Sequence, residues 1–143
     1  MSPGNLIVDT SALLAYVDAS EPDHEAVTEH LEAATGLLVV SPYVVAELDY
    51  LVATRHGVDA ELAVLEQLGG GAWELAGFSA QDLTRAQSVI ATYRDQTIGV
   101  ADASNVVLAE RYRTRSIATL DHRHFEVLRP LSGVRFSVLP AVR

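Results

Sequence analysis

Two acidic residues each stand directly after a short apolar run. Asp9 follows residues 6–8, and Asp121 follows residues 116–120. In open parallel sheets, ligands bind just beyond the carboxyl ends of the strands, so both acids are predicted to lie where such sites are built. Taken singly, each acid also fits a structural role as a strand-end or helix-capping side chain.

Two further acids stand on helical patterns. Glu47 shares a predicted helix face with Val44 and Leu51, three residues before it and four after it. Asp102 lies in the first turn of a helix predicted over residues 99–112, where the helix dipole favours negative charge. A carboxylate on an apolar face is costly unless it is paired or bound to a metal. The alternatives are an arginine partner for Glu47 and a helix-stabilising role for Asp102.

Four such acids near one sheet edge indicate a divalent cation. Like charges a few ångströms apart repel strongly unless a cation lies between them. The chain has no cysteine, so thiolate ligands are excluded, and carboxylate oxygens prefer hard ions such as Mg²⁺ or Mn²⁺. We therefore predict a metal site formed by Asp9, Glu47, Asp102 and Asp121.

The elements that must position these acids alternate along the chain. Apolar runs predict strands at 6–8, 37–41, 73–76, 116–121 and 134–139. A first helix is predicted to start at Thr10 or Ser11, which would be its N-cap. Further helices are predicted over residues 22–34, 42–56, 58–68, 79–95 and 99–112. Alternating strands and helices predict an α/β fold: a three-layer sandwich in which helices flank a central, mainly parallel sheet.

Composition limits the remaining possibilities. The chain has 143 residues, 49% of them apolar, which predicts one packed domain over residues 1–143. The net charge of −9 argues against broad, nonspecific nucleic-acid binding. No apolar run approaches the ~20 residues that a membrane-spanning helix needs. No basic segment opens the chain, so we expect a cytoplasmic protein without membrane contact.

The order of these motifs resembles the PIN domain, a metal-dependent ribonuclease fold. The resemblance is closest to the VapC toxins of bacterial toxin–antitoxin pairs, and it extends from residue 6 to residue 139. The stretches that carry it are residues 6–15, 41–48, 98–104 and 119–125.

The resemblance implies an endoribonuclease, the toxin of a type II toxin–antitoxin module, that cleaves structured RNA such as tRNA or rRNA with a metal-activated water. It implies Asp9 and Asp102 as the principal ligands of Mg²⁺ or Mn²⁺, with Glu47 and Asp121 completing the catalytic site. It also implies a cognate antitoxin and a homodimer as partners. Hydroxyls that would orient the carboxylates or a bound water are those of Thr10, Ser11, Ser104 and Thr119.

All basic residues of the chain are arginines, and they concentrate around Asp121 in the last third. Guanidinium groups bind phosphate bidentately, so this cluster predicts an RNA-binding rim. Salt bridges within an acidic chain explain any single arginine equally well. The side chains assigned to RNA binding are Arg113, Arg115, Arg123 and His122.

Two other functions are weighed against this hypothesis. The first is a PIN-fold protein that binds RNA or a protein partner without turnover, which the complete set of acids disfavours. The second is a magnesium-dependent phosphatase that acts through an aspartyl-phosphate. Such enzymes need an Asp-x-Asp signature and a lysine, whereas this chain has Asp9-Thr10-Ser11 and no lysine.

Overall fold

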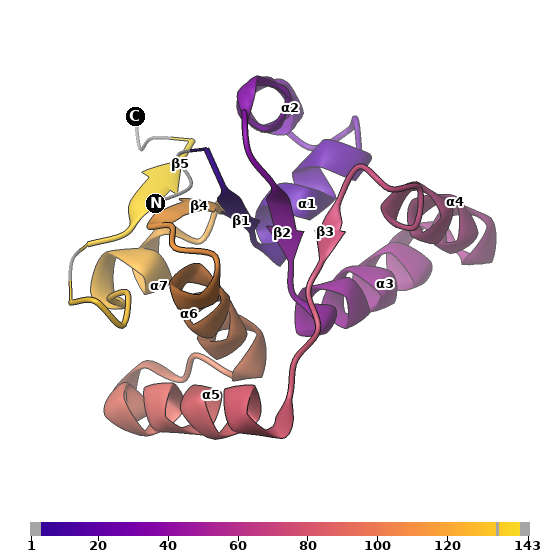
Figure 1. Ribbon diagram of the computed structural model, residues 1–143. Helices are drawn as coiled ribbons and strands as arrows, with labels where there is room; N and C mark the ends of the chain where they lie inside the picture. The colour runs from indigo at the N-terminus through magenta and orange to yellow at the C-terminus, as the bar shows by residue number, and fades with distance from the viewer. Residues whose placement is uncertain (1–3, 134, 141–143) are drawn as a thin grey trace.

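A parallel sheet forms the centre of the computed structural model, which describes residues 4–133 and 135–140. Within these residues the sheet has five strands in the order β3-β2-β1-β4-β5, and every pairing is parallel (Figure 1). The expected parallel α/β architecture is confirmed. The strands are β1 (Leu6–Val8), β2 (Leu38–Val40), β3 (Glu74–Leu75), β4 (Ser116–Ala118) and β5 (Ser137–Leu139).

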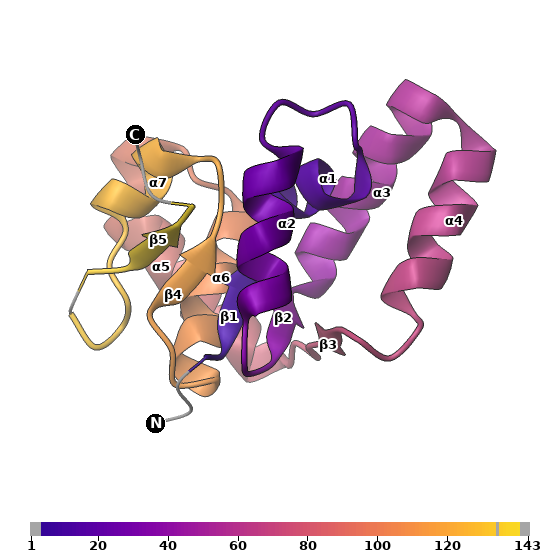
Figure 2. The ribbon, with the colours of Figure 1, turned by 90° about the horizontal axis from the view of Figure 1, so that it is seen from above.

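Helices cover both faces of the sheet, as Figures 1 and 2 show together. One apolar core lies between the sheet and α1–α4, and a second lies between the sheet and α5–α7. The three-layer sandwich is therefore confirmed. The helices are α1 (Thr10–Val17), α2 (His24–Ala33), α3 (Pro42–His56), α4 (Val58–Leu68), α5 (Ala80–Thr92), α6 (Val100–Arg111) and α7 (His122–Val127), with a 3-10 turn, η1 (Arg94–Gln96), after α5.

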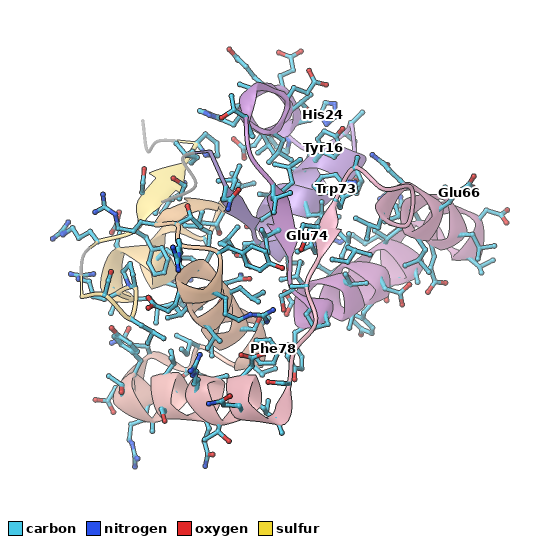
Figure 3. All side chains as sticks on the ribbon, in the orientation of Figure 1. Tyr16, His24, Glu66, Trp73, Glu74 and Phe78 are labelled. Atoms are coloured by element: carbon cyan, nitrogen blue, oxygen red, sulfur yellow. The ribbon has the colours of Figure 1, made fainter. Side chains whose placement is uncertain are left out.

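Strand β1 is buried on both faces, which explains its continuous apolar sequence. Leu6 and Val8 point into the core beneath α1–α4, whereas Ile7 points into the core beneath α5–α7. This alternation follows from the two-residue period of a strand. Trp73 is buried edge-on against Tyr16 with ring centroids 5.5 Å apart (Figure 3).

Local capping signals define several helix starts. The Ser41 hydroxyl accepts a hydrogen bond of 3.1 Å from the amide of Tyr43, and Pro42 occupies the first turn of α3. Ser79 and Asp82 form a reciprocal capping box at the start of α5. Both helix starts confirm the sequence prediction.

Most element boundaries agree with those expected to within two residues, and four differences bear on the site or the fold. The N-cap of α1 is Asp9 rather than Thr10 or Ser11, and its side chain makes no capping bond because it turns toward other partners. The helix expected to reach residue 95 ends at Thr92 and continues as η1. Strand β4 ends at Ala118, before Asp121. Strand β5 begins at Ser137, and residue 134, where it was expected to begin, lies outside the described residues.

Helix α7 was not expected from the sequence. It has six residues, too few for a periodic apolar pattern to stand out. Asp121 is its N-cap, and the side chain accepts a bond of 3.4 Å from the amide of His124. Phe125 is buried in the core beneath α5–α7. No helix among the described residues is long and apolar enough to cross a membrane.

Candidate active site

A cleft of about 550 Å³ opens at the carboxyl edge of the sheet. Its lining includes all four acids assigned to the site, contributed by segments far apart in the chain. We call it the acidic cleft, and we define it by the charged side chains of Asp9, Glu47, Arg55, Asp102, Asp121 and His124.

The topology explains how these side chains meet. Strands β1 and β4 are neighbours with Ile7 opposite Ile117, so the residues that follow them emerge side by side. Asp9 directly follows β1, and Asp121 follows β4 by a short turn. Asp102 enters from the first turn of α6. This edge is where ligands bind in open parallel sheets.

Asp9 is the most enclosed of the four acids, with 4% of its surface exposed. One carboxylate oxygen accepts a bond of 3.0 Å from Asn105 Nδ2, and the other accepts a bond of 2.8 Å from Thr119 Oγ1. Burial, and then the negative charge of Asp102, raise the pKa of Asp9 from 3.8 to about 7, although the Thr119 hydroxyl opposes the shift.

A chain of hydroxyls fixes the orientation of the Asp9 carboxylate. The amide of Leu120 donates to Ser11 Oγ at 2.8 Å, and Ser11 Oγ lies 3.2 Å from Thr119 Oγ1. Since Thr119 gives its one hydroxyl proton to Asp9, the proton between the two hydroxyls belongs to Ser11. The amide of Asp121 also donates to Thr119 Oγ1, at 2.9 Å. Thr119 thus links the β4 turn to Asp9.

Asp102 and Asp121 contact the same histidine. Nδ1 of His124 lies 2.8 Å from an oxygen of Asp102 and 3.0 Å from an oxygen of Asp121. Burial raises the pKa of Asp102, and the charge of His124 opposes that rise while Asp121 adds to it. The imidazole therefore stands between two carboxylates that would otherwise repel each other.

The structure corrects the setting expected for Glu47. Its side chain is exposed and opens into the acidic cleft, while Val44 on the same helix is buried in the core. Glu47 is therefore not a buried charge on an apolar face, and no arginine pairs with it among the described residues.

The donor chemistry of the acidic cleft fits a divalent metal. Carboxylate oxygens are hard ligands, and the burial of Asp9 disfavours its charge unless a cation is near. Thr10 Oγ1 and Asn105 Oδ1 are buried beside them without a hydrogen-bond partner in the described part of the chain. As the side chains stand there, no three His, Asp or Glu residues are close enough to hold one ion.

The hydroxyls assigned to the site have different positions. Thr119 and Ser11 act on Asp9 as described, and Thr10 lies buried in the cleft lining. Ser104 does not touch a carboxylate. It is fully buried, donates to the carbonyl of Ala101 at 2.7 Å and lies 2.7 Å from Ser41 Oγ, so it joins α6 to the start of α3.

Two arginines assigned to an RNA-binding rim lie far from the acids. Arg113 and Arg115 stand between α6 and β4, at the amino edge of the sheet. Asp102 begins α6 at the cleft, and a helix of 12 residues is about 18 Å long. The expectation that both arginines border the acids is wrong, because α6 carries the chain to the opposite edge. Arg123 is exposed and His122 half-buried in the first turn of α7, next to His124.

Three side chains of the site escaped the sequence analysis. Asn105 was read as part of an ordinary helix, although an amide within an otherwise apolar helix was a signal. His124 was not assigned to the site, although it lies three residues after Asp121, one helical turn on. Arg55 could have been identified from its spacing, because it lies eight residues after Glu47 on the same face of α3.

Comparison with known proteins decides the family. A model of the PIN domain matches residues 6–129. The chain belongs to the PIN domain family. The resemblance inferred from the motifs is thereby confirmed, over nearly the range from which it was inferred.

Proteins similar to this chain include VapC and VapBC proteins, in agreement with the resemblance inferred from the motifs. The chain is 65% identical to Ribonuclease VapC26 of Mycobacterium tuberculosis over 135 residues, which are 94% of this chain and 100% of that relative. Its fold is similar to that of VapC20 of Mycobacterium tuberculosis, a sarcin-ricin loop cleaving toxin, with a TM-score of 0.75 at 17% identity over 81% of this chain and 89% of that one. DNA-bound VapBC of Salmonella typhimurium has a TM-score of 0.68 at 20% identity, covering 94% and 97%. The prediction of a VapC-type PIN-domain ribonuclease toxin is confirmed.

Proposed function

We propose that this PIN domain is an endoribonuclease toxin that hydrolyses RNA phosphodiester bonds at the acidic cleft. The observation that carries the proposal is the buried carboxylate of Asp9, held by Asn105 and Thr119 in a cleft that three further acids line. The 65% identity with Ribonuclease VapC26 supports the same activity.

We infer that Mg²⁺ or Mn²⁺ is the cofactor. Asp9 and Asp102 would be its principal ligands, with Glu47 and Asp121 completing the site. When bound, such an ion lowers the pKa of a water and offsets the charge that develops on the phosphate. The protein contributes orientation: the hydroxyls of Ser11 and Thr119 fix the Asp9 carboxylate. No side-chain nucleophile is required in this scheme.

A cognate antitoxin is the expected protein partner, and the chain is expected to meet it in the cytoplasm. VapBC of Salmonella typhimurium and VapBC-1 of nontypeable Haemophilus influenzae, both structural neighbours, support that expectation. The apolar sequences of residues 12–17 and 44–52 suggested contact faces, but residues 12–15 are buried in the core, and so are Val44, Leu48 and Val52. Exposed apolar side chains lie on the outer faces of α3 and α4. They are Tyr50, Val58, Leu62 and Leu65, and we propose this surface for the antitoxin or for a homodimer.

Cleavage of tRNA and rRNA by the purified protein tests the proposed activity. We expect cleavage with Mg²⁺ or Mn²⁺ by the wild type, loss of cleavage in Asp9→Asn, and full cleavage in Asp59→Asn, whose exposed carboxylate lies on α4. Mapping of the new ends identifies the RNA and the bond. RNA bound without cleavage by the wild type would instead favour a PIN fold that acts by binding alone, and equal cleavage by Asp9→Asn would remove Asp9 from the site.

A further inference from the structure

Arg55 is the one arginine among the described residues that line the acidic cleft. It follows Leu51 and Glu47 on α3 at intervals of four residues, and all three side chains line the same cavity. The Arg55 side chain does not cap α3, because the helix ends with a bond from the amide of Gly57 to the carbonyl of Ala53.

The charge of the cleft sets a problem for an RNA substrate. Four carboxylates line it, and a phosphodiester chain that approaches them is repelled. A bound divalent ion offsets part of that charge at the scissile phosphate only. Phosphates on either side need cationic partners of their own, and Arg113 and Arg115 lie at the opposite edge of the sheet.

Arg55 has most of its binding capacity free. Its Nη1 donates one bond of 3.2 Å to Glu21 Oε1, and its side chain is 49% exposed while that of Glu21 is 27% exposed. A guanidinium carries five N–H donors, so several remain for a phosphate. Ion pairs this exposed contribute little to stability, and exchange of one anion for another is therefore inexpensive.

The loop that carries Glu21 has a second attachment to α3. His56 Nε2 lies 3.0 Å from Asp18 Oδ2, and the other oxygen of Asp18 accepts bonds from the hydroxyl and the amide of Ser20. These contacts keep the connection between α1 and α2 in place when Arg55 leaves Glu21.

We propose that Arg55 binds an RNA phosphate that flanks the cleavage site, and that Glu21 occupies the place of this phosphate in the free protein. Eight residues of helix separate Glu47 from Arg55, a rise of about 12 Å, so the phosphate is a neighbour of the scissile group. The inference rests on the proposed ribonuclease function. It identifies Arg55 as a substrate-binding residue and Glu21 as its competitor.

Two substitutions that break the same ion pair separate this role from a structural one. In metal-free buffer, where RNA is not cleaved, the Kd of a fluorescein-labelled stem-loop RNA is measured over a range of KCl concentrations. We expect Arg55→Ala to raise Kd about three- to tenfold and to reduce the slope of log Kd against log salt by about 0.7, the loss of one phosphate contact. Glu21→Gln should lower Kd about two- to fivefold, since Arg55 is released.

Further variants complete the design. Arg55→Lys keeps the charge and should retain the salt slope with an intermediate Kd, because an ammonium binds phosphate without the bidentate fork. Arg85→Ala, at an exposed arginine of α5, is the matched control and should bind as the wild type does.

The two possible failures are distinguishable. If Arg55→Ala and Glu21→Gln weaken binding alike, the ion pair is structural and the inference is overturned. An unchanged Kd and slope in Arg55→Ala overturns it as well. In either case cleavage by the wild type, and its loss in Asp9→Asn, still supports the ribonuclease. Absence of RNA cleavage by the wild type would overturn both proposals.

Discussion

The two edges of the sheet use buried polar groups in opposite ways. At the amino edge, Asn5 is buried and satisfied: its Nδ2 donates to the carbonyl of Tyr112 at 3.1 Å, and its Oδ1 accepts from the amide of Leu37 at 2.9 Å. Its own carbonyl accepts a bond of 2.7 Å from Thr114 Oγ1. This neutral network joins β1 to the segments before β2 and β4.

At the carboxyl edge, the polar groups are charged and incompletely satisfied. Asp9 is buried near Asp102 with its pKa raised, and Thr10 Oγ1 and Asn105 Oδ1 have no partner among the described residues. Burial of charge without full compensation is unfavourable for folding. The difference indicates that the amino edge serves stability and the carboxyl edge serves ligand binding, and substitutions at each edge test it.

Asp9→Asn should produce the largest effect: it should lower RNA cleavage and raise the stability of the protein. We expect RNA cleavage to fall by about 10³-fold or more, because a proposed principal ligand of the ion is neutralised. The free energy of unfolding without metal at pH 8 should rise by about 2 kcal/mol. Removal of the buried charge stabilises the native state by more than this, but the amide replaces one of the two oxygens that accept hydrogen bonds from Asn105 and Thr119. Cleavage rates and urea unfolding measure the two effects. A loss of both activity and stability would show that Asp9 is a structural residue like Asn5.

Asn5→Ala should give the reverse result. The amide of Leu37 and the carbonyl of Tyr112 would lose their partner, at a cost of about 3 kcal/mol in the free energy of unfolding. Cleavage per folded molecule should stay at the wild-type value, since the acidic cleft lies at the other edge. Gln87→Ala, an exposed amide on α5, is the control for urea unfolding. A cleavage defect in folded Asn5→Ala would mean that the two edges are coupled.

The pH dependence of stability is a further test of the difference between the two edges of the sheet. Burial raises the pKa of Asp9 from 3.8 to about 7, so the native protein keeps a proton that the unfolded chain has lost between these values. The stabilisation is complete below pH 3.8 and is lost as the pH rises through 7, by about 4 kcal/mol in metal-free protein, roughly 3 kcal/mol of it between pH 5 and pH 8. Thermal unfolding at pH 5 and pH 8 measures it. Asp9→Asn should lack this component, and equal pH slopes in both proteins would contradict the assignment.

Addition of the cofactor should act on the carboxyl edge alone. At pH 8, Mn²⁺ or Mg²⁺ at about ten times its Kd should stabilise the wild type by about 1.4 kcal/mol through preferential binding to the native state. Tm should therefore rise in the wild type and in Asn5→Ala, but not in Asp9→Asn. An equal rise in all three proteins would indicate binding outside the acidic cleft.

The sequence was sufficient to identify the acids whose positions follow from the order and direction of the strands. Asp9 and Asp121 follow apolar strands, and parallel strands bring such positions to one edge, so local sequence was sufficient. Glu47 was assigned to the site on the expectation that it lies on a buried apolar face, whereas its side chain is exposed in the cleft. Helical spacing alone does not distinguish a face that packs in the core from one that lines a cleft. The order of the strands and of helices α1–α6 was also predictable, and α3 and α5 begin at proline or serine signals in the sequence. The short helix α7 was not predictable in this way.

The contacts that complete the site depend on tertiary structure. Asn105 reaches Asp9 across 96 residues of sequence, which no local pattern reports. Arg113 and Arg115 are near Asp121 in the sequence, but β4 lies between them and places them at the other edge. Proximity along the chain was therefore a poor guide to proximity in space, and Arg55, remote in sequence, lies in the cleft instead.

Arg123 and Arg115 provide the smallest and last test of the comparison. Both are exposed, but Arg123 lies in the first turn of α7 beside His124, whereas Arg115 lies at the amino edge. Interactions between exposed charges fade beyond about 8–10 Å at physiological salt, so only Arg123 is near enough to attract RNA held at the cleft. We expect Arg123→Ala to raise the Kd for RNA about two- to threefold and to lower its salt dependence, and Arg115→Ala to leave both unchanged.

Fluorescence anisotropy of a labelled stem-loop RNA measures both variants side by side. An effect in Arg115→Ala as large as that in Arg123→Ala would mean that RNA extends along the molecule to the amino edge, and the division between a stabilising edge and a binding edge would then fail.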